Sequence, residues 1–218
     1  MEKDTILKAI KSIKEQSKKR NFSQSYDLII NLRNLNLKKP EEKVDLFVTL
    51  PHTRGKKTKI CGLFGPELYN EGKENCDKLI QKEEFANLKK RDVKNLEKEY
   101  DFFLGQANIM PDIAKTFGRT LGAKGKMPNP KAGCIIPPKA QLKPIITKLQ
   151  KVVRITTKNE LVIKCQIGTE TMKDEEVVEN ILAIYNSVIN FVPLHDQNIR
   201  NVFLKLTMGK PELIGGKA

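Results

Sequence analysis

Hydrophobic and polar positions repeat at two different periods along this chain. Residues 1–18 place Ile6, Ile10 and Ile13 on one face at helical spacing, which predicts an amphipathic helix. The stretches SYDLIINLR (25–33) and KVDLFVTL (43–50) alternate at a period of two, which predicts two strands separated by a polar loop. The chain is therefore expected to begin with a helix and two strands.

Between about residues 58 and 152 the pattern changes to strands that alternate with helices. Strands are expected at KICGLFG (59–65), around Leu79 and at YDFFLGQA (100–107). Helices are expected near 66–75, over 83–99, from Met110 onward and at AQLKPIITKLQK (140–151). This order predicts a parallel sheet covered by helices.

The alternating pattern returns after Val152. Strands are expected at 152–158, 160–168 and 201–209, with an amphipathic helix over 174–189. Neither terminal piece has enough elements for its own core, so together they should form one domain that is interrupted by another. We predict a discontinuous α+β sandwich domain of residues 1–57 and 153–218, with an inserted Rossmann-like three-layer α/β domain of residues 58–152. The linkers are expected at 54–57 and 152–156.

The charge of the chain points to a polyanion as its partner. Among 218 residues there are 40 Lys and Arg against 26 Asp and Glu, a formal net charge of +14, and 39% of residues are hydrophobic. The basic residues gather in stretches such as RGKKTK (54–59) and the loop 118–133, as in surfaces that bind nucleic acid. Solvated lysine faces on a basic protein are the alternative. Without a long apolar run or signal peptide, we expect a soluble cytoplasmic protein without a membrane partner.

The motifs of common enzymes and metal sites are missing. The loop 118–133 fits neither GxxxxGK[ST] nor GxGxxG, so the nucleotide-enzyme signature is lacking. His52 and His195 lie far apart in the sequence, and the four cysteines form no CxxC pair. We expect no catalytic residue, no metal and no cofactor, and we expect the cysteines to lie in the core.

Three stretches have residues suited to RNA. KKRNFSQSYD (18–27) is a basic turn with an aromatic side chain, and KLTMGKP (205–211) ends a strand with a threonine and a glycine between lysines. Thr207 offers a hydroxyl donor that can reach a 2′-hydroxyl or a phosphate. GRTLGAKGKMPNPKAG (118–133) combines glycine with basic residues, which lets a backbone approach phosphate. Ordinary turn chemistry, with Phe22 in the core, is the alternative for each.

These stretches resemble blocks of the universal large-subunit ribosomal protein one family, in its archaeal and eukaryotic branch. RNFSQSYDLIINLRNLNLKKP, LPHTRGK, GRTLGAKGKMPNPKAG, CQIGTETM and LTMGK occur in the family's order and cover nearly the whole chain. Many relatives carry proline and arginine at the positions of Ala123 and Lys124, and proline at the position of Lys210. The first two differences keep the positive charge but stiffen the loop less.

The resemblance implies a non-enzymatic protein of the mobile stalk beside the ribosomal exit site. It implies that the split domain recognises large-subunit ribosomal RNA by shape. It also implies that the protein assists release of deacylated transfer RNA at the exit site and represses translation of its own mRNA. The protein is expected to be cytoplasmic, on the ribosome, and monomeric when free.

The resemblance also implies which residues touch RNA. The expected RNA-binding residues are Arg20, Asn21, Phe22, Ser25, Gly168, Lys205, Thr207, Met208 and Gly209. A second RNA contact is expected at Arg119, Lys124, Lys126 and Lys131, for which packing inside the inserted domain is the alternative. Two other classes stay open. A ribosome-assembly factor of this fold would carry long basic extensions, and a Rossmann-type enzyme would retain a dinucleotide through purification.

Overall fold

The computed structural model describes residues 1–18, 20–39, 41–138 and 140–216, and it divides into two compact units. The first, here called the split unit, combines Met1–Lys56 with the chain from Lys151 onward. The second, the inserted unit, is Lys57–Gln150. The expected fold class, mixed helices and sheets in a split and an inserted part, is confirmed.

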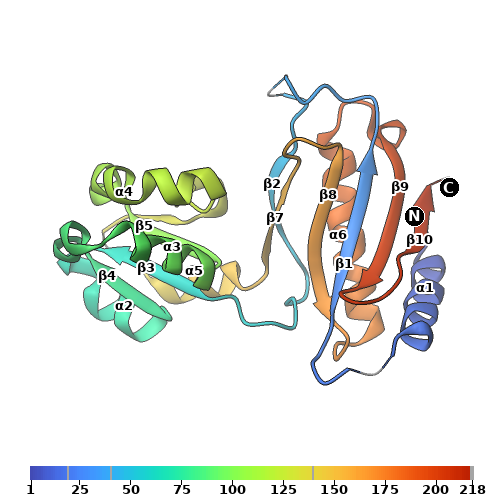
Figure 1. The fold of residues 1–218 in the computed structure, drawn as a ribbon, viewed down its shortest axis with the longest axis horizontal. Coiled ribbons are helices and arrows are strands. Elements are labelled where there is room, and N and C mark those ends of the chain that lie inside the picture. The colour runs from blue at the N-terminus through green and yellow to red at the C-terminus, as the bar shows by residue number, and fades with distance from the viewer. Residues whose placement is uncertain (19, 40, 139, 217–218) are drawn as a thin grey trace. The chain divides into compact units, whose positions relative to one another are not determined.

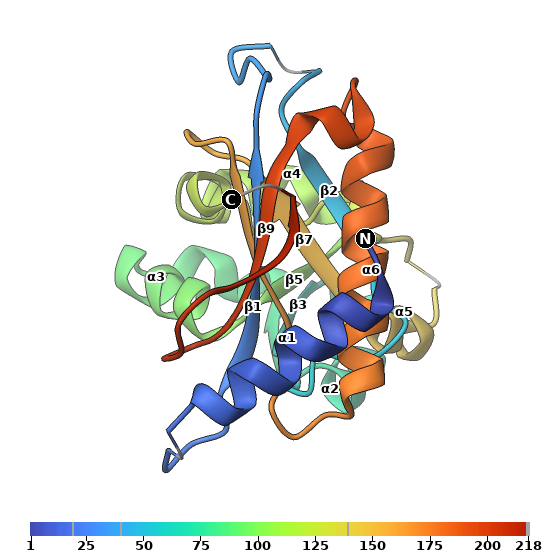
Figure 2. The same cartoon turned by 90° about the vertical axis from the view of Figure 1, so that its right-hand side faces the viewer.

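The split unit is built on a four-stranded antiparallel sheet in the order β10-β9-β1-β8. These strands are β1 (Ser25–Leu32), β8 (Val162–Thr169), β9 (Ile199–Leu206) and β10 (Glu212–Gly216). Helices α1 (Lys3–Gln16) and α6 (Asp174–Phe191) pack against this sheet (Figures 1 and 2). The central position of β1 gives it an antiparallel neighbour on each side.

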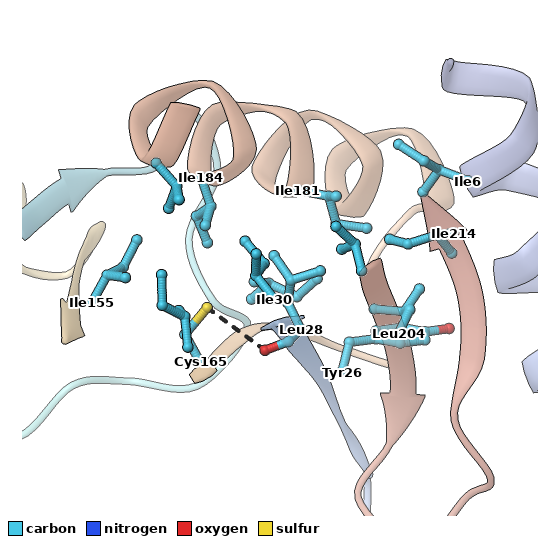
Figure 3. Close-up of a cluster of buried hydrophobic side chains, with 14 of the residues drawn as sticks. Ile6, Tyr26, Leu28, Ile30, Ile155, Cys165, Ile181, Ile184, Leu204 and Ile214 are labelled. Carbon is cyan, nitrogen blue, oxygen red and sulfur yellow. Dashed lines mark hydrogen bonds between the residues drawn. The ribbon is translucent and has the colours of Figure 1, made fainter. Parts of the chain in front are cut away.

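The strict alternation along β1 decides which side of the sheet is covered. Tyr26, Leu28 and Ile30 are fully buried; Leu28 and Ile30 point toward Ile181 and Ile184 of α6, and the Tyr26 ring lies beside Leu204 of β9 (Figure 3). The side chains between them in the sequence stay partly exposed. One face of the sheet thus forms the core with the helices, and the other presents polar groups.

A two-stranded ladder of β2 (Asp45–Thr49) and β7 (Val152–Thr156) completes the split unit. Arg154 donates two hydrogen bonds to the Asp45 carboxylate, at 2.9 and 3.0 Å, and its guanidinium lies 5.4 Å from the centre of the Phe47 ring. The stretch 152–156, expected both as part of a strand and as a linker, is a strand of the split unit. Its valines pair with the end of β2 and pack in the core.

The inserted unit has a parallel sheet in the order β4-β3-β5-β6. Its strands are β3 (Ile60–Phe64), β4 (Lys78–Gln81), β5 (Phe102–Gln106) and β6 (Ile135–Ile136). Helices α3 (Lys90–Glu99) and α4 (Met110–Phe117) cover one face, and α2 (Tyr69–Asn75) and α5 (Leu142–Leu149) cover the other (Figure 1). β3 is buried at every position because both faces are covered.

The single helix expected over 83–99 is wrong, because the structure breaks it into two elements. A 3₁₀ turn covers Lys82–Asn87, and α3 begins at Lys90. The turn directs Phe85 into the core, where its ring meets Phe117 edge to face at 5.1 Å. Asp92 accepts the Lys89 N–H at 3.1 Å and so satisfies an orphan donor at the start of the new helix.

The two ends of the inserted unit are tied together by one side chain. The Gln150 amide accepts a hydrogen bond from the Thr58 N–H at 2.8 Å and donates one to the Thr58 carbonyl at 2.9 Å. Gln150 thereby pairs with the backbone of Thr58 as a neighbouring strand would. We call this arrangement the Thr58–Gln150 clamp.

Candidate nucleic-acid interface

Turns of the split unit that are far apart in the sequence meet at one end of its sheet. β1 begins at Ser25, beside the last residues of both its neighbours: Ser25 pairs with Thr169, and Tyr26 with Leu206. The turn before β1 and the turn after β9 are therefore side by side. We call residues 20–25 and 207–210 together the turn interface.

Thr207 fastens these two turns. Its N–H donates to the Ser25 carbonyl at 3.0 Å. Its hydroxyl donates to the same carbonyl and accepts the Ser25 N–H, each at 3.2 Å. Because the single hydroxyl proton is used on Ser25, the capacity left on this exposed oxygen is a lone pair. The sequence suggested Thr207 as a donor to RNA, whereas this geometry presents an acceptor.

Gln24, which was not predicted as a site residue, is buried beneath the turn interface and holds its turns together by hydrogen bonds. It is 2% exposed. Its amide donates to the Ser17 hydroxyl at 3.0 Å and accepts the Met208 N–H at 3.2 Å, while its carbonyl accepts the Glu170 N–H at 2.9 Å. One buried residue thus connects the end of α1, the turn after β9 and the turn after β8. A glutamine inside the block NFSQSYD, between residues expected to touch RNA, was the available signal.

Two large apolar side chains of the turn interface face solvent. Phe22 is 52% exposed and Met208 is 61% exposed. The alternative that Phe22 belongs to the core is therefore wrong. Beside them, a groove of about 380 Å³ lies between the end of α1 and the turn after β9, and its rim carries Lys18, Arg20 and Lys210. Exposed apolar groups among cations suit a ligand with both phosphates and flat bases.

Other predicted residues have different surroundings. Gly168 is buried opposite Tyr26, and a Cβ there would lie 3.2 Å from the sulfur of Met172, a tight contact that a small shift of this side chain would relieve. Lys205 lies opposite Asp27 on the polar face of the sheet. Burial raises the pKa of Asp27, and the charge of Lys205 opposes that shift. Asn21 is exposed, and Gly209 closes the turn by donating to the Leu206 carbonyl at 2.9 Å.

The loop 118–133 of the inserted unit falls into two halves of different character. Arg119 and Lys124 are exposed on and just after a π-helical turn, Gly118–Gly122. Lys126 donates to the carbonyls of Glu97 and Tyr100, so its ammonium is used within the unit. Lys131 lies in a 3₁₀ turn, where its N–H donates to the Asn129 side chain at 2.9 Å. Internal hydrogen bonds thus account for the Lys126 ammonium, whereas the side chains of Arg119, Lys124 and Lys131 stay exposed.

The place where a Rossmann-type sheet binds its nucleotide is occupied by side chains. That place lies beyond the carboxyl ends of β3 and β5, where the strand order reverses. Gln106 is buried there, accepts the Gly65 N–H at 2.9 Å and donates to the Glu67 carboxylate at 2.8 Å. A carboxylate at this turn repels phosphate, which disfavours the nucleotide-enzyme alternative.

The four cysteines carry thiols that resist ionisation. Burial raises the pKa of Cys61, Cys76 and Cys165 to about 12 and that of Cys134 to about 11, so each thiol stays protonated near neutral pH. Within the described ranges no group of His, Cys, Asp and Glu could hold a metal ion. No helix of the same ranges has the length and apolar character of a membrane span.

Comparison with known proteins gives one consistent family. Residues 12–210 match the family described as "Ribosomal protein L1p/L10e family". The chain is similar to "Large ribosomal subunit protein uL1" of Methanothermococcus thermolithotrophicus, with 39% identity over 216 residues, 98% of this chain and 99% of the relative. Proteins of the same name from Nanoarchaeum equitans and Thermococcus kodakarensis are 40% and 38% identical, over 89% and 95% of this chain and 92% and 95% of theirs.

Proposed function

Because the chain belongs to the ribosomal protein L1p/L10e family, we propose that the turn interface of its split unit binds ribosomal RNA of the large subunit. As a member of this family the chain is a structural, non-enzymatic ribosomal protein that works in translation. The same membership supports a place on cytoplasmic ribosomes. The observation that supports this site most is the exposure of Phe22 and Met208 around the fixed hydroxyl of Thr207.

The geometry suggests how RNA would be read at the turn interface. Thr207 offers a lone pair to a ribose 2′-hydroxyl, a donor that DNA lacks. Phe22 and Met208 would cover that hydrogen bond and exclude water from it. Lys18, Arg20 and Lys210 would attract the phosphates without regard to sequence. Recognition would then follow the shape of a folded RNA and the position of its 2′-hydroxyls.

Replacing Thr207 by Val tests this role of the hydroxyl. Val keeps the branched shape but leaves the 2′-hydroxyl without its acceptor, so the affinity for the stalk ribosomal RNA fragment should fall roughly 5- to 150-fold, or about 1–3 kcal/mol. A 2′-deoxyribose at the contacted nucleotide should lower the affinity of the normal protein for the fragment and leave the affinity of the variant nearly unchanged. Filter binding or calorimetry on both RNAs gives the double-mutant cycle.

Thr49→Val is the matched control, since Thr49 is an exposed strand threonine of the same unit. It should bind the fragment normally. Thr207→Val also loses the bonds to Ser25 and should lower the free energy of unfolding by about 1 kcal/mol. Met208→Ala should weaken binding, compared with Leu194→Ala at another exposed apolar residue of the unit. If a folded Thr207→Val protein binds the fragment normally, the turn interface is not the RNA site.

We propose two finer roles for the same protein. Its own mRNA would bind at the turn interface by presenting the same RNA shape, so Thr207→Val should relieve repression and weaken ribosomal RNA binding by similar factors. Release of deacylated transfer RNA would require surfaces beyond the turn interface. A translation assay on ribosomes saturated with the variant or with its Thr49→Val control separates the two roles, because once the ribosomal site is filled only repression should respond to the hydroxyl.

A further inference from the structure

The inserted unit has a basic groove of its own. The groove, about 480 Å³ in volume, lies between α3 and the π-helical turn Gly118–Gly122. Lys90, Lys94 and Lys98 contribute from the helix, and Arg119 and Lys124 contribute from the turn and the residues after it. The sequence predicts an RNA contact at Arg119 and Lys124, and the structure adds the three helix lysines beside them.

The five cations of this groove are not neutralised by the protein. Across the described part of the chain, none of them forms an ion pair within 4.0 Å. The acid that lines the groove, Glu97, lies 3.6 Å from the Lys126 ammonium. Lys126 is held from inside by two backbone carbonyls. The groove therefore keeps a strong positive potential, which a polyanion would relieve.

The lysines of α3 are regularly spaced. They stand four residues apart, which places them on one face at intervals of about 6 Å along the helix axis. Such like charges at i and i+4 destabilise a helix by a few tenths of a kcal/mol per pair. A row of cations kept at this cost suits the repeated charge of a phosphodiester backbone.

Neither close packing nor a left-handed backbone requires the two glycines of the adjoining turn. Gly118 and Gly122 have ordinary backbone angles, since neither shows a positive φ. A Cβ on either would meet no atom within 4 Å. By contrast, a Cβ on Gly72 would lie 2.7 Å from the Phe64 ring. Glycine costs about 1 kcal/mol against alanine in a helix, so a bare backbone here is best explained by the close approach of a partner.

We propose that this groove is a second RNA-binding site, which takes the phosphodiester backbone of a folded RNA independently of the turn interface. The choice of RNA as the polyanion rests on the proposed function. A membrane surface fits less well, because the exposed large apolar side chains among the described residues, Phe22, Phe191, Leu194 and Met208, all belong to the split unit. Lys126 and Lys131 have no part in the groove.

The test uses the full chain with Lys90, Lys94 and Lys98 all replaced by Gln. The probe is a duplex RNA of about two helical turns and arbitrary sequence, titrated at several salt concentrations. Each lost phosphate contact should reduce the slope of log affinity against log salt by about 0.7–0.9, so the slope should fall by about 2–3. The matched control replaces Lys73, Lys143 and Lys148, three exposed lysines on other helices of the unit, and should change the slope far less.

Gly122→Ala tests the close approach. The added methyl has room in the free protein and favours the helix, so the melting temperature should stay the same or rise while affinity for the duplex falls severalfold. Affinity for the stalk fragment, measured on the same variants, separates this proposal from the proposed function. That affinity should stay normal, as it responds to Thr207.

Three results would overturn the proposal. Equal effects of the groove variant and the control would leave only general positive charge. A loss of stalk-fragment affinity as large as that of Thr207→Val would make the groove part of the first interface. Binding of phosphatidylcholine–phosphatidylserine vesicles that depends on the groove lysines and excludes the duplex would identify a membrane as the occupant.

Discussion

Single residues fix the turn interface through bonds to backbone atoms. The Gln24 amide donates to the Ser17 hydroxyl and accepts the Met208 N–H, and the Thr207 hydroxyl donates to the Ser25 carbonyl. These bonds set the turns before any ligand arrives, which lowers the ordering cost of binding. Asp27 has an unfavourable effect near the same end of the sheet. Its carboxylate is partly buried on the polar face, and this burial disfavours the charged form.

Replacing Asp27 by Asn should stabilise the protein near neutral pH. Burial raises the pKa of Asp27 above its ordinary value of 3.8, although Lys205 draws it down. Below that value the carboxyl is protonated in both states. As the pH rises, the unfolded chain releases its proton first, and the normal protein loses stability until its folded pKa is passed. The variant lacks this loss.

Urea unfolding from pH 3.5 to 7.5 checks the Asp27→Asn prediction. The gain in free energy of unfolding should grow across the acid range and then stay constant. A gain of the same size at every pH would show that shape or hydrogen bonding, and not charge, distinguishes the two side chains.

At the scale of elements, the sequence predicts best where one periodicity acts alone. Burial alternates along β1 without exception, and the apolar residues at 26, 28, 30 and 32 predict its buried face, although Ile29 is apolar on the other face. The strand β6 has only two residues, too few to show a period, and β10 ends in two glycines that suggest a turn. The break between residues 82–87 and α3 depends on the packing of Phe85 against Phe117, which no local pattern reveals.

The turn interface was predictable for a different reason. Its residues occur in stretches with unusual composition, and antiparallel pairing of β1 with β8 and β9 then brings those stretches together. Gln24 was missed because its importance lies in three tertiary bonds. The lysines of α3 were missed because exposed helix faces are usually rich in lysine. Only the tertiary structure shows that they line one groove together with Arg119 and Lys124.

Helix α6 contains a buried asparagine that should be important for stability. Asn180 is fully buried, donates to the Ile167 carbonyl of β8 at 2.9 Å and accepts the His52 N–H at 3.1 Å. Asn180→Ala leaves both backbone groups without this partner and should lower the free energy of unfolding by about 1–3 kcal/mol. Asn186→Ala, at an exposed position of the same helix, should change it by less than about 0.7 kcal/mol, in the stabilising direction. Equal urea midpoints for the two variants would contradict the prediction.

At the scale of the whole molecule, the split unit should survive removal of the inserted unit. Lys56 would be joined to Lys151 by a short Gly/Ser bridge, which keeps all of β7. We expect the shortened protein to fold, to bind the stalk fragment within a few-fold of the full chain, and to lose the contribution of the α3 lysines to duplex RNA. Circular dichroism and RNA affinity on one preparation check this. A folded protein without stalk-fragment binding would move the primary RNA site into the inserted unit.

The Thr58–Gln150 clamp has a consequence for the order in which the chain folds. The split unit must join segments that are separated by the whole of Lys57–Gln150, and closing an unstructured loop of that length costs about 4 kcal/mol in chain entropy. Once the inserted unit has folded, the clamp holds its two ends within hydrogen-bonding distance, and most of that cost has already been met. Refolding should therefore be sequential, with the inserted unit first. Gln150→Ala should reduce the folding rate of the split unit more than it lowers the free energy of unfolding. Without the clamp the two ends of the inserted unit are held less closely, so the two segments of the split unit must search a larger volume to pair.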